Sequence, residues 1–176
     1  VAVGSYSLDA NTTGSQNTAF GNASLGANTT GDGNVAVGRN ALDANTTAGG
    51  NTGIGTSALG SNTTGANNTA LGYYSLLANT TGYDNVAIGS YSLDSNTTGH
   101  SNIAIGYGAL NTNTDGDANV AIGLHALRYA TTGSTNIAIG QGTLDAITTA
   151  ERNIAIGHNA LTAPSSSYQV AMGFAA

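Results

Sequence analysis

Cys and Trp are absent from this chain, and Pro and Met occur once each among 176 residues. Without Cys, neither a disulfide framework nor a thiolate metal site can form. Aromatic residues make up only 6% of the chain and charged residues only 7%, whereas 40% is hydrophobic and 26 residues are Gly. The chain is therefore too apolar for a disordered polar segment, yet it has few of the large side chains that fill a conventional core.

Positive charge is also scarce. Three Lys and Arg residues stand against nine Asp and Glu, which gives a net charge of −6. This balance argues against nucleic acid and against anionic membrane surfaces as partners. The sequence has no apolar run of about eighteen residues, so we expect no membrane contact by this segment.

One 17-residue unit repeats along the whole chain, as in NVAIGSYSLDSNTTGHS at 85–101. We number the positions of this unit from its Asn. Three marks recur at this step: Asn at 17, 34, 51, 68, 85, 102, 119, 136 and 153; Gly at 4, 21, 38, 55, 72, 89, 106, 123, 140 and 157; and Leu at 8, 25, 42, 59, 76, 93, 110, 127, 144 and 161. A fixed period of this kind predicts a solenoid, here a single all-β, parallel β-roll array over 1–176 with about ten coils.

Each unit predicts two short strands and two corners. Positions 2 to 4 hold an aliphatic residue or Thr, then Ala, then a large apolar residue, and they predict the first strand. Ala at position 3, replaced only by Gly53, indicates a crowded site, and the apolar residues at position 4 indicate core. We expect a second strand around the Leu at position 9. Gly at position 5 predicts a corner that needs positive φ or close backbone approach. Asn-Thr-Thr-Gly at positions 12 to 15 predicts the second corner, with left-handed residues.

The two ends of the array differ. Position 2 is often Thr early, as at Thr69, and aliphatic later, as at Ile137. The last full coil is one residue short, which predicts a degenerate coil at 162–169. Because Val1 already falls at position 2 of a unit, we interpret the chain as a fragment of a longer fibre.

The segments NVAIGSYSL, NIAIGYGAL, NVAIGLHAL and NIAIGHNAL resemble the head repeats of trimeric autotransporter adhesins, and related repeats occur in phage-like fibre proteins. The resemblance covers essentially the whole chain, although the Asn-Thr-Thr-Gly insert makes these units longer than those of the adhesin heads. It implies a left-handed roll, a side-by-side homotrimer and an adhesive role at an extracellular bacterial surface. A narrow single roll also buries little apolar area, which favours association. We expect the faces of the first strands to pack together, most tightly near the C-terminus.

The expected function is therefore that of a structural and adhesive fibre segment, whose surface receptor is a protein or a glycan. A segment of a phage-like tail fibre is an alternative, and so is an ice-binding solenoid with Thr ladders. The Asn-Thr-Thr triplets, as at Asn96, are formal glycosylation acceptors, but they also suit a stacked turn. Adjacent Thr residues on a strand point to opposite sides, which weakens the ice-binding interpretation.

The candidate receptor-binding residues are four Tyr at positions 6 and 7 of three successive coils: Tyr73, Tyr74, Tyr91 and Tyr107. The alternative is that these rings merely cover a neighbouring coil or subunit. We expect no cofactor and no metal, because the three His fall at different unit positions: His100, His125 and His158. We expect solvated turn residues in the position 10 acids, Asp9, Asp43, Asp94 and Asp145. No Ser is expected to have a base beside it, and we expect no enzyme.

Overall fold

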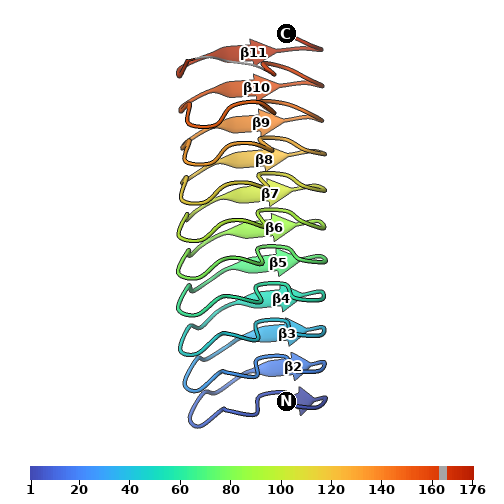
Figure 1. Ribbon diagram of the computed structural model, residues 1–176, viewed down its shortest axis with the longest axis vertical. Helices are drawn as coiled ribbons and strands as arrows, with labels where there is room; N and C mark the ends of the chain where they lie inside the picture. Colours follow the sequence, from blue (N-terminus) through green and yellow to red (C-terminus); the bar gives the residue numbers. More distant parts are fainter. Residues whose placement is uncertain (163–165) are drawn as a thin grey trace.

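The computed structural model describes residues 1–162 and 166–176, which form one straight rod of stacked coils (Figure 1). Each coil contributes one short strand, and the strands join into an 11-stranded parallel sheet in sequence order. The strands are β1 (Ala2–Val3), β2 (Thr18–Phe20), β3 (Val35–Val37), β4 (Thr52–Ile54), β5 (Thr69–Leu71), β6 (Val86–Ile88), β7 (Ile103–Ile105), β8 (Val120–Ile122), β9 (Ile137–Ile139), β10 (Ile154–Ile156) and β11 (Val170–Met172). The predicted parallel β-solenoid of about ten coils is confirmed.

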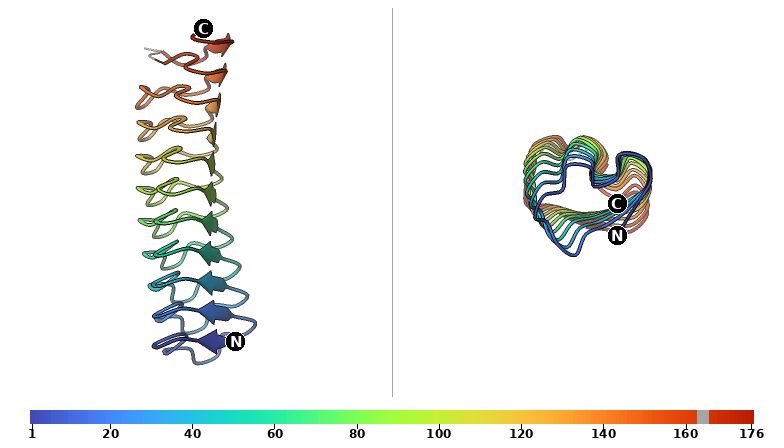
Figure 2. Two further views of the ribbon diagram at one scale, coloured as in Figure 1. Left: turned by 90° about the vertical axis from the view of Figure 1, so that its right-hand side faces the viewer. Right: turned by 90° about the horizontal axis from the view of Figure 1, so that it is seen from below.

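The register follows the repeat. Val86 pairs with Ile103, 17 residues later, whereas Ile154 pairs with Val170, so the last coil is one residue shorter. Part of the expected degenerate coil at 162–169, residues 163–165, lies outside the described residues. Seen along the rod axis, successive coils have similar outlines, each turned slightly relative to the one before (Figure 2). Like positions of neighbouring coils therefore stack into rows.

The strands turn the small residue inward. Ala at position 3 is fully buried from β2 to β10, apart from Gly53 in β4, while positions 2 and 4 are half-buried or exposed. A Cβ on Gly53 would already lie 3.1 Å from the carbonyl oxygen of Ala58 and 3.3 Å from Cγ of Leu42. This confirms the crowding predicted for position 3, because the opposite wall comes too close for a longer side chain.

The core assignment of position 4 was wrong. Its residues lie on the outside of the described chain, with Phe20 58%, Leu71 44% and Ile54 37% exposed. Alternation along a strand explains this, because position 3 points inward and its two neighbours must then point outward. The interior is filled instead by Ala at position 3, a small residue at position 8 and the fully buried Leu at position 9, such as Leu93.

No second strand forms in the described coils. Positions 7 and 9 both take left-handed backbone, as at Tyr91 (φ 57°) and Leu93 (φ 51°). Their N–H groups point along the rod in opposite directions, because Tyr91 donates to the carbonyl of Tyr73 in the preceding coil and Leu93 to that of Ala109 in the following one, both at 3.0 Å. These axial hydrogen bonds and the burial of Leu offset the cost of left-handed conformations for non-Gly residues.

The two corners are built differently. Gly at position 5 fulfils both predicted reasons for glycine: Gly89 has φ +127°, and a Cβ there would lie 2.7 Å from the carbonyl oxygen of Gly106. The corner at positions 12 to 15 does not use left-handed residues, contrary to expectation. Its Asn side chain folds inward instead, and Asn96 Nδ2 donates to the Gly99 carbonyl at 2.9 Å.

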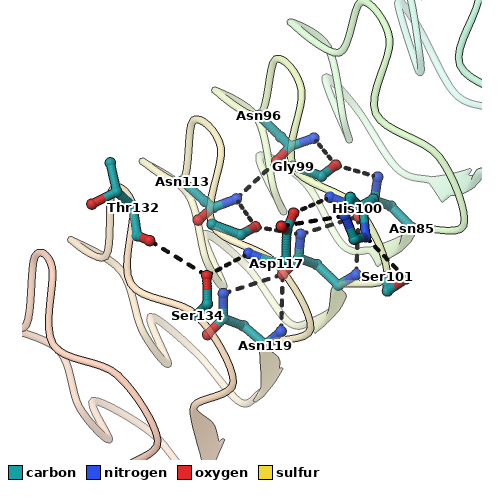
Figure 3. Close-up of polar contacts among 12 residues, drawn as sticks. Asn85, Asn96, Gly99, His100, Ser101, Asn113, Asp117, Asn119, Thr132 and Ser134 are labelled. Atoms are coloured by element: carbon teal, nitrogen blue, oxygen red, sulfur yellow. Dashed lines mark hydrogen bonds and ion pairs between the residues drawn. The ribbon is translucent and has the colours of Figure 1, made fainter. Parts of the chain in front are cut away.

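Two ladders of buried Asn run through the coils at this corner (Figure 3). Asn96 at position 12 donates to Asn79 Oδ1 in the preceding coil at 2.9 Å. The position 1 residue Asn85 donates to the same Gly99 carbonyl at 2.9 Å, and its Oδ1 accepts the N–H of Asn102 at 3.0 Å. Each Asn thus satisfies buried polar groups in its own coil and links that coil to the next.

Candidate binding surface

The predicted Tyr residues meet on one ridge of the rod. Position 7 is held rigidly by its left-handed backbone and axial hydrogen bonds, so the side chains at this position project beside one another from successive coils. The rings of Tyr73 and Tyr74 stack with centroids 4.0 Å apart, and Tyr91 packs edge-on against both, at 5.5 and 5.8 Å. Tyr107 continues the row at 5.9 Å from Tyr91.

The spacing expected between Tyr74 and Tyr91 was the interstrand distance of about 4.8 Å. Their ring centroids lie 5.8 Å apart because the rings pack edge to face and not face to face. The neighbouring hydroxyl of Tyr74 raises the pKa of Tyr73 to about 12. Tyr73 therefore stays neutral at physiological pH and presents a ring and a hydroxyl to solvent, with 43% of the residue exposed.

A pocket of about 290 Å³ opens beside this aromatic row. It spans three coils and is lined by residues at positions 6, 7 and 10: Tyr91, Asp94, Tyr107, Gly108, Asn111, His125 and Arg128. Gly108 creates the hollow, because position 7 carries rings in the coils on either side, at Tyr91 and His125. His125 extends the aromatic row, with its ring 5.6 Å from that of Tyr107.

The polar wall of this pocket is formed by position 10 of three successive coils. Asp94 is half-buried, and its Oδ1 is buried with no hydrogen-bond partner. Burial raises the pKa of this carboxyl above its ordinary value. The interpretation of position 10 acids as solvated turn residues is thus wrong for Asp94, and also for Asp145, whose Oδ1 is likewise buried and unpartnered.

The sequence prediction found two lining residues, Tyr91 and Tyr107, and missed the others. Asn111 and Arg128 share unit position 10 with Asp94, so a reading of rows across consecutive coils could have found them. The sequence shows Gly108 between two ring-bearing residues at position 7, but not the direction in which the His125 ring leans over it.

The three His lie apart, as their unit positions indicated. His158 stacks on Phe174 near the C-terminus, with ring centroids 5.2 Å apart. His100 stacks on Tyr83 at 4.6 Å, and its Nε2 lies 3.2 Å from Oδ2 of Asp117 (Figure 3). The described part of the chain contains no group of three or more His, Cys, Asp or Glu residues placed to hold a metal ion.

His100 does lie beside a Ser, contrary to expectation. Its Nδ1 is 3.3 Å from Ser101 Oγ, on the side opposite Asp117 (Figure 3). The nearby main-chain N–H groups are already used, because His100 donates to Asp117 Oδ1 at 2.8 Å and Ser101 donates to the Tyr83 carbonyl at 3.0 Å. Neither can stabilise an oxyanion, so this arrangement lacks a main component of acyl-transfer catalysis.

The Asn-Thr-Thr corner serves the fold. Asn96 is fully buried and hydrogen-bonded, which leaves its amide no room for a glycan in the folded chain. The hydroxyl of the first Thr of the triplet donates a hydrogen bond to the next coil along the rod, as from Thr97 to the Thr114 carbonyl at 3.0 Å. The second, such as Thr98, is exposed. At this corner the described coils thus present one row of exposed Thr residues, interrupted by Asp115, and not the paired rows of a flat Thr face.

No protein-family model, curated protein or solved structure matches this chain. Within the described residues, no helix is long and apolar enough to cross a membrane. The site must therefore be interpreted from its own geometry: an aromatic row, a polar pocket beside it, and an apolar sheet face along the rod.

Proposed function

We propose that this chain is a structural and adhesive fibre segment that assembles as a side-by-side homotrimer. The observation that carries this proposal is the outer face of the sheet. Positions 2 and 4 form two continuous outward rows along the rod without a single charged residue. Exposed members include Phe20, Leu71, Ile103, Ile139 and Ile154. A contiguous apolar surface of this length on a soluble rod is typical of an interface.

Three copies around one axis would cover this face. Each chain presents a regular sheet face that turns gradually along the rod (Figure 2), since every strand pairs with its neighbour in the same register apart from the shift of one residue at β11. The resemblance to adhesin head repeats supports the trimer and a left-handed roll. The aliphatic residues at position 2 predict tighter contact toward the C-terminus, so Thr69 should be less buried between chains than Ile137.

The aromatic row supports the adhesive role. Tyr73, Tyr74, Tyr91 and Tyr107 pack on a different part of the coil from the sheet face, and Tyr107 is 53% exposed. Rigid aromatic side chains give large contact area at small entropy cost, which is typical of recognition surfaces. The receptor is a molecule on another cell or surface, and the fibre belongs to a bacterial surface or a phage-like particle.

Light scattering tests the assembly. We expect a mass close to three times 17.2 kDa. Ile88→Lys places a charge on the sheet face and should yield monomers, because desolvating an unpaired ammonium at an interface is costly. Thr98→Lys, in the same coil but on the exposed corner, is the matched control and should stay trimeric. A monomeric wild-type protein would refute the assembly.

Attachment of protein-coated beads to cells tests the adhesive role. Replacing all four Tyr by Ser should leave the β-rich circular dichroism signal unchanged and weaken attachment. Unchanged attachment would mean that these rings only cover neighbouring coils. Thermal hysteresis in solutions of the wild-type protein would favour the ice-binding alternative instead.

A further inference from the structure

The polar wall of the pocket at Gly108 carries polar groups without hydrogen-bond or ion-pair partners among the described residues. Asn111 Nδ2 donates to the Tyr91 carbonyl at 3.1 Å, while its Oδ1 accepts no hydrogen bond from the described residues. The carboxylate of Asp94 and the guanidinium of Arg128 form no ion pair or hydrogen bond with any residue that the structure describes. An acceptor, an amide and a cation thus stand in one row at the ladder spacing of about 4.8 Å. The guanidinium of Arg128 lies over the Tyr129 ring, 5.0 Å from its centroid, and keeps its N–H groups free of ion pairs with the described residues.

The other wall is aromatic. Tyr91 and Tyr107 pack edge to face with centroids 5.9 Å apart, and His125 continues the wall beyond the hollow. Because Gly108 carries no side chain, the row of rings is interrupted between Tyr91 and His125, whose ring leans over the glycine. A flat ligand can then lie against the Tyr rings on one side and reach the polar row on the other. The volume of about 290 Å³ is at the lower end of small-molecule sites, which suits one or two small rings and not a long polymer segment.

These features narrow the ligand class. An apolar ligand would leave three polar groups desolvated and unpaired, at a cost of about 1–3 kcal/mol each. A phosphate dianion would meet the Asp94 carboxylate, and a simple cation would meet Arg128. A ring with one apolar face, several hydroxyls and a single carboxylate can contact the aromatic wall and also provide partners for the polar groups of the other wall. Its CH face packs on the Tyr rings, and its carboxylate accepts from Arg128. Its hydroxyls donate to Asn111 Oδ1 and to Asp94 Oδ2, because Oδ1 of Asp94 is buried.

We propose that the pocket at Gly108 binds one ring of an acidic saccharide, of the uronic acid type. This inference deepens the proposed adhesive function by assigning a ligand class to the surface beside the Tyr row. The chain has only three Lys and Arg residues and a net charge of −6, so an Arg that lines a pocket without an ion pair to a described carboxylate is a specific feature. Arg also matches the planar geometry of a carboxylate through paired hydrogen bonds.

The test compares two sugars that differ only in the carboxylate. We would titrate the protein with methyl glucuronide and with methyl glucoside and follow binding by NMR. We expect weak but saturable binding of the glucuronide, at least about tenfold tighter than that of the glucoside, because a charge-assisted hydrogen bond discriminates by that order. Arg128→Gln should remove the preference for the glucuronide.

A variant that fills the pocket provides a second test of the proposal. Gly108→Asn places a side chain in the hollow at φ +60°, a conformation that Asn40 and Asn159 already adopt at position 7. Its Cβ would lie 2.9 Å from Cδ2 of His125, so the imidazole must shift and the site closes. Gly142→Asn is the matched control, at the same position and φ +62° but outside the pocket. We expect Gly108→Asn to lose sugar binding and Gly142→Asn to bind the sugar as the wild-type protein does.

Equal affinity for the two sugars, no binding of either, or unchanged binding by Gly108→Asn would each overturn the proposal. The bead assay separates this failure from that of the adhesive function. If wild-type protein attaches to cells and Gly108→Asn attaches equally well, the saccharide site is wrong while the adhesive role stands. If the sugars bind as expected but the wild-type protein attaches to no surface, the adhesive role fails alone.

Discussion

The Asn ladder at position 12 makes a quantitative prediction about two identical truncations. Asn96 and Asn113 are both fully buried and lie in neighbouring coils. Asn96 sits inside the ladder: its Nδ2 donates to Asn79 Oδ1 and to Gly99, and its Oδ1 accepts from Asn113 at 2.8 Å. Asn113 sits at the end, because the next coil carries Ala130, and its Oδ1 is buried without a partner.

The two Ala substitutions should therefore differ in cost. Asn96→Ala removes three hydrogen bonds and leaves Asn79 Oδ1 newly unpaired, whereas Asn113→Ala removes two and only moves the unpaired oxygen back to Asn96. The carbonyls of Gly99 and Gly116 keep a second donor in both variants, from Asn85 and Asn102. At about 1 kcal/mol per bond and about 1–3 for an unpaired buried acceptor, we expect a loss of about 5 kcal/mol for Asn96→Ala and about 2 for Asn113→Ala.

Urea unfolding followed by circular dichroism measures this difference. All proteins must be compared at one concentration, since association contributes to apparent stability. The slope of free energy against urea should stay constant, so that a shift in midpoint reports stability alone. Equal losses in the two variants, or a larger loss for Asn113→Ala, would refute the view that the ladder is a chain of hydrogen bonds with a defined end.

Three further predictions concern the corner, the core and pH. Gly89→Ala should cost several kcal/mol, since φ +127° is closed to Ala and its Cβ would meet the main-chain carbonyl oxygen of Gly106. Gly142→Ala should cost only about 1–2 kcal/mol, since its φ is left-handed and its Cβ would meet only the flexible end of the Asn159 side chain. A similar loss in both variants on thermal unfolding would mean that the corner at Gly89 adapts to a side chain. Leu93→Asp should abolish the folded circular dichroism signal, because it buries a charge in the core. Ile105→Asp should fold but fail to assemble, because it places the charge on the outer sheet face. A soluble and folded Leu93→Asp variant would contradict the assigned core. Burial raises the folded-state pKa of Asp94, so the stability linked to this group is present below its unfolded pKa and falls as pH rises through the folded value. Asp94→Asn should therefore raise the urea midpoint at about pH 7 and change it little at about pH 3, and a lower midpoint at pH 7 would contradict this sign.

The repeat alone predicted most of the architecture. The period of 17 gave the coil count and the parallel register, and the small residue at position 3 indicated a crowded wall. The Gly at position 5 was predicted for both of the reasons that its φ and its carbonyl contact show, because no other residue type satisfies both. These features depend on local sterics and on periodicity, which a sequence shows directly.

The features that the sequence did not predict depend on the direction in which a side chain points or the backbone turns. Leu71 at position 4 and Leu93 at position 9 are equally apolar, yet one faces out and the other in, because the neighbouring Ala must face the narrow interior. The segment around Leu93 is not a strand, since left-handed backbone in ordinary residues has no sequence signature comparable to that of Gly. The polar wall of the pocket was missed for a similar reason, as Asp94 and Arg128 are far apart in sequence but two coils apart in the rod.

The central claim is that chains associate through the outer sheet face, and a spin label tests it most directly. Because the chain has no Cys, one engineered Cys gives one labelled site. Ile105→Cys places the label on the sheet face, and Thr98→Cys places it on the exposed corner. We predict dipolar broadening of the electron paramagnetic resonance spectrum at Ile105 and a sharp spectrum at Thr98. Broadening at Thr98 alone, or at neither site, would contradict the claim.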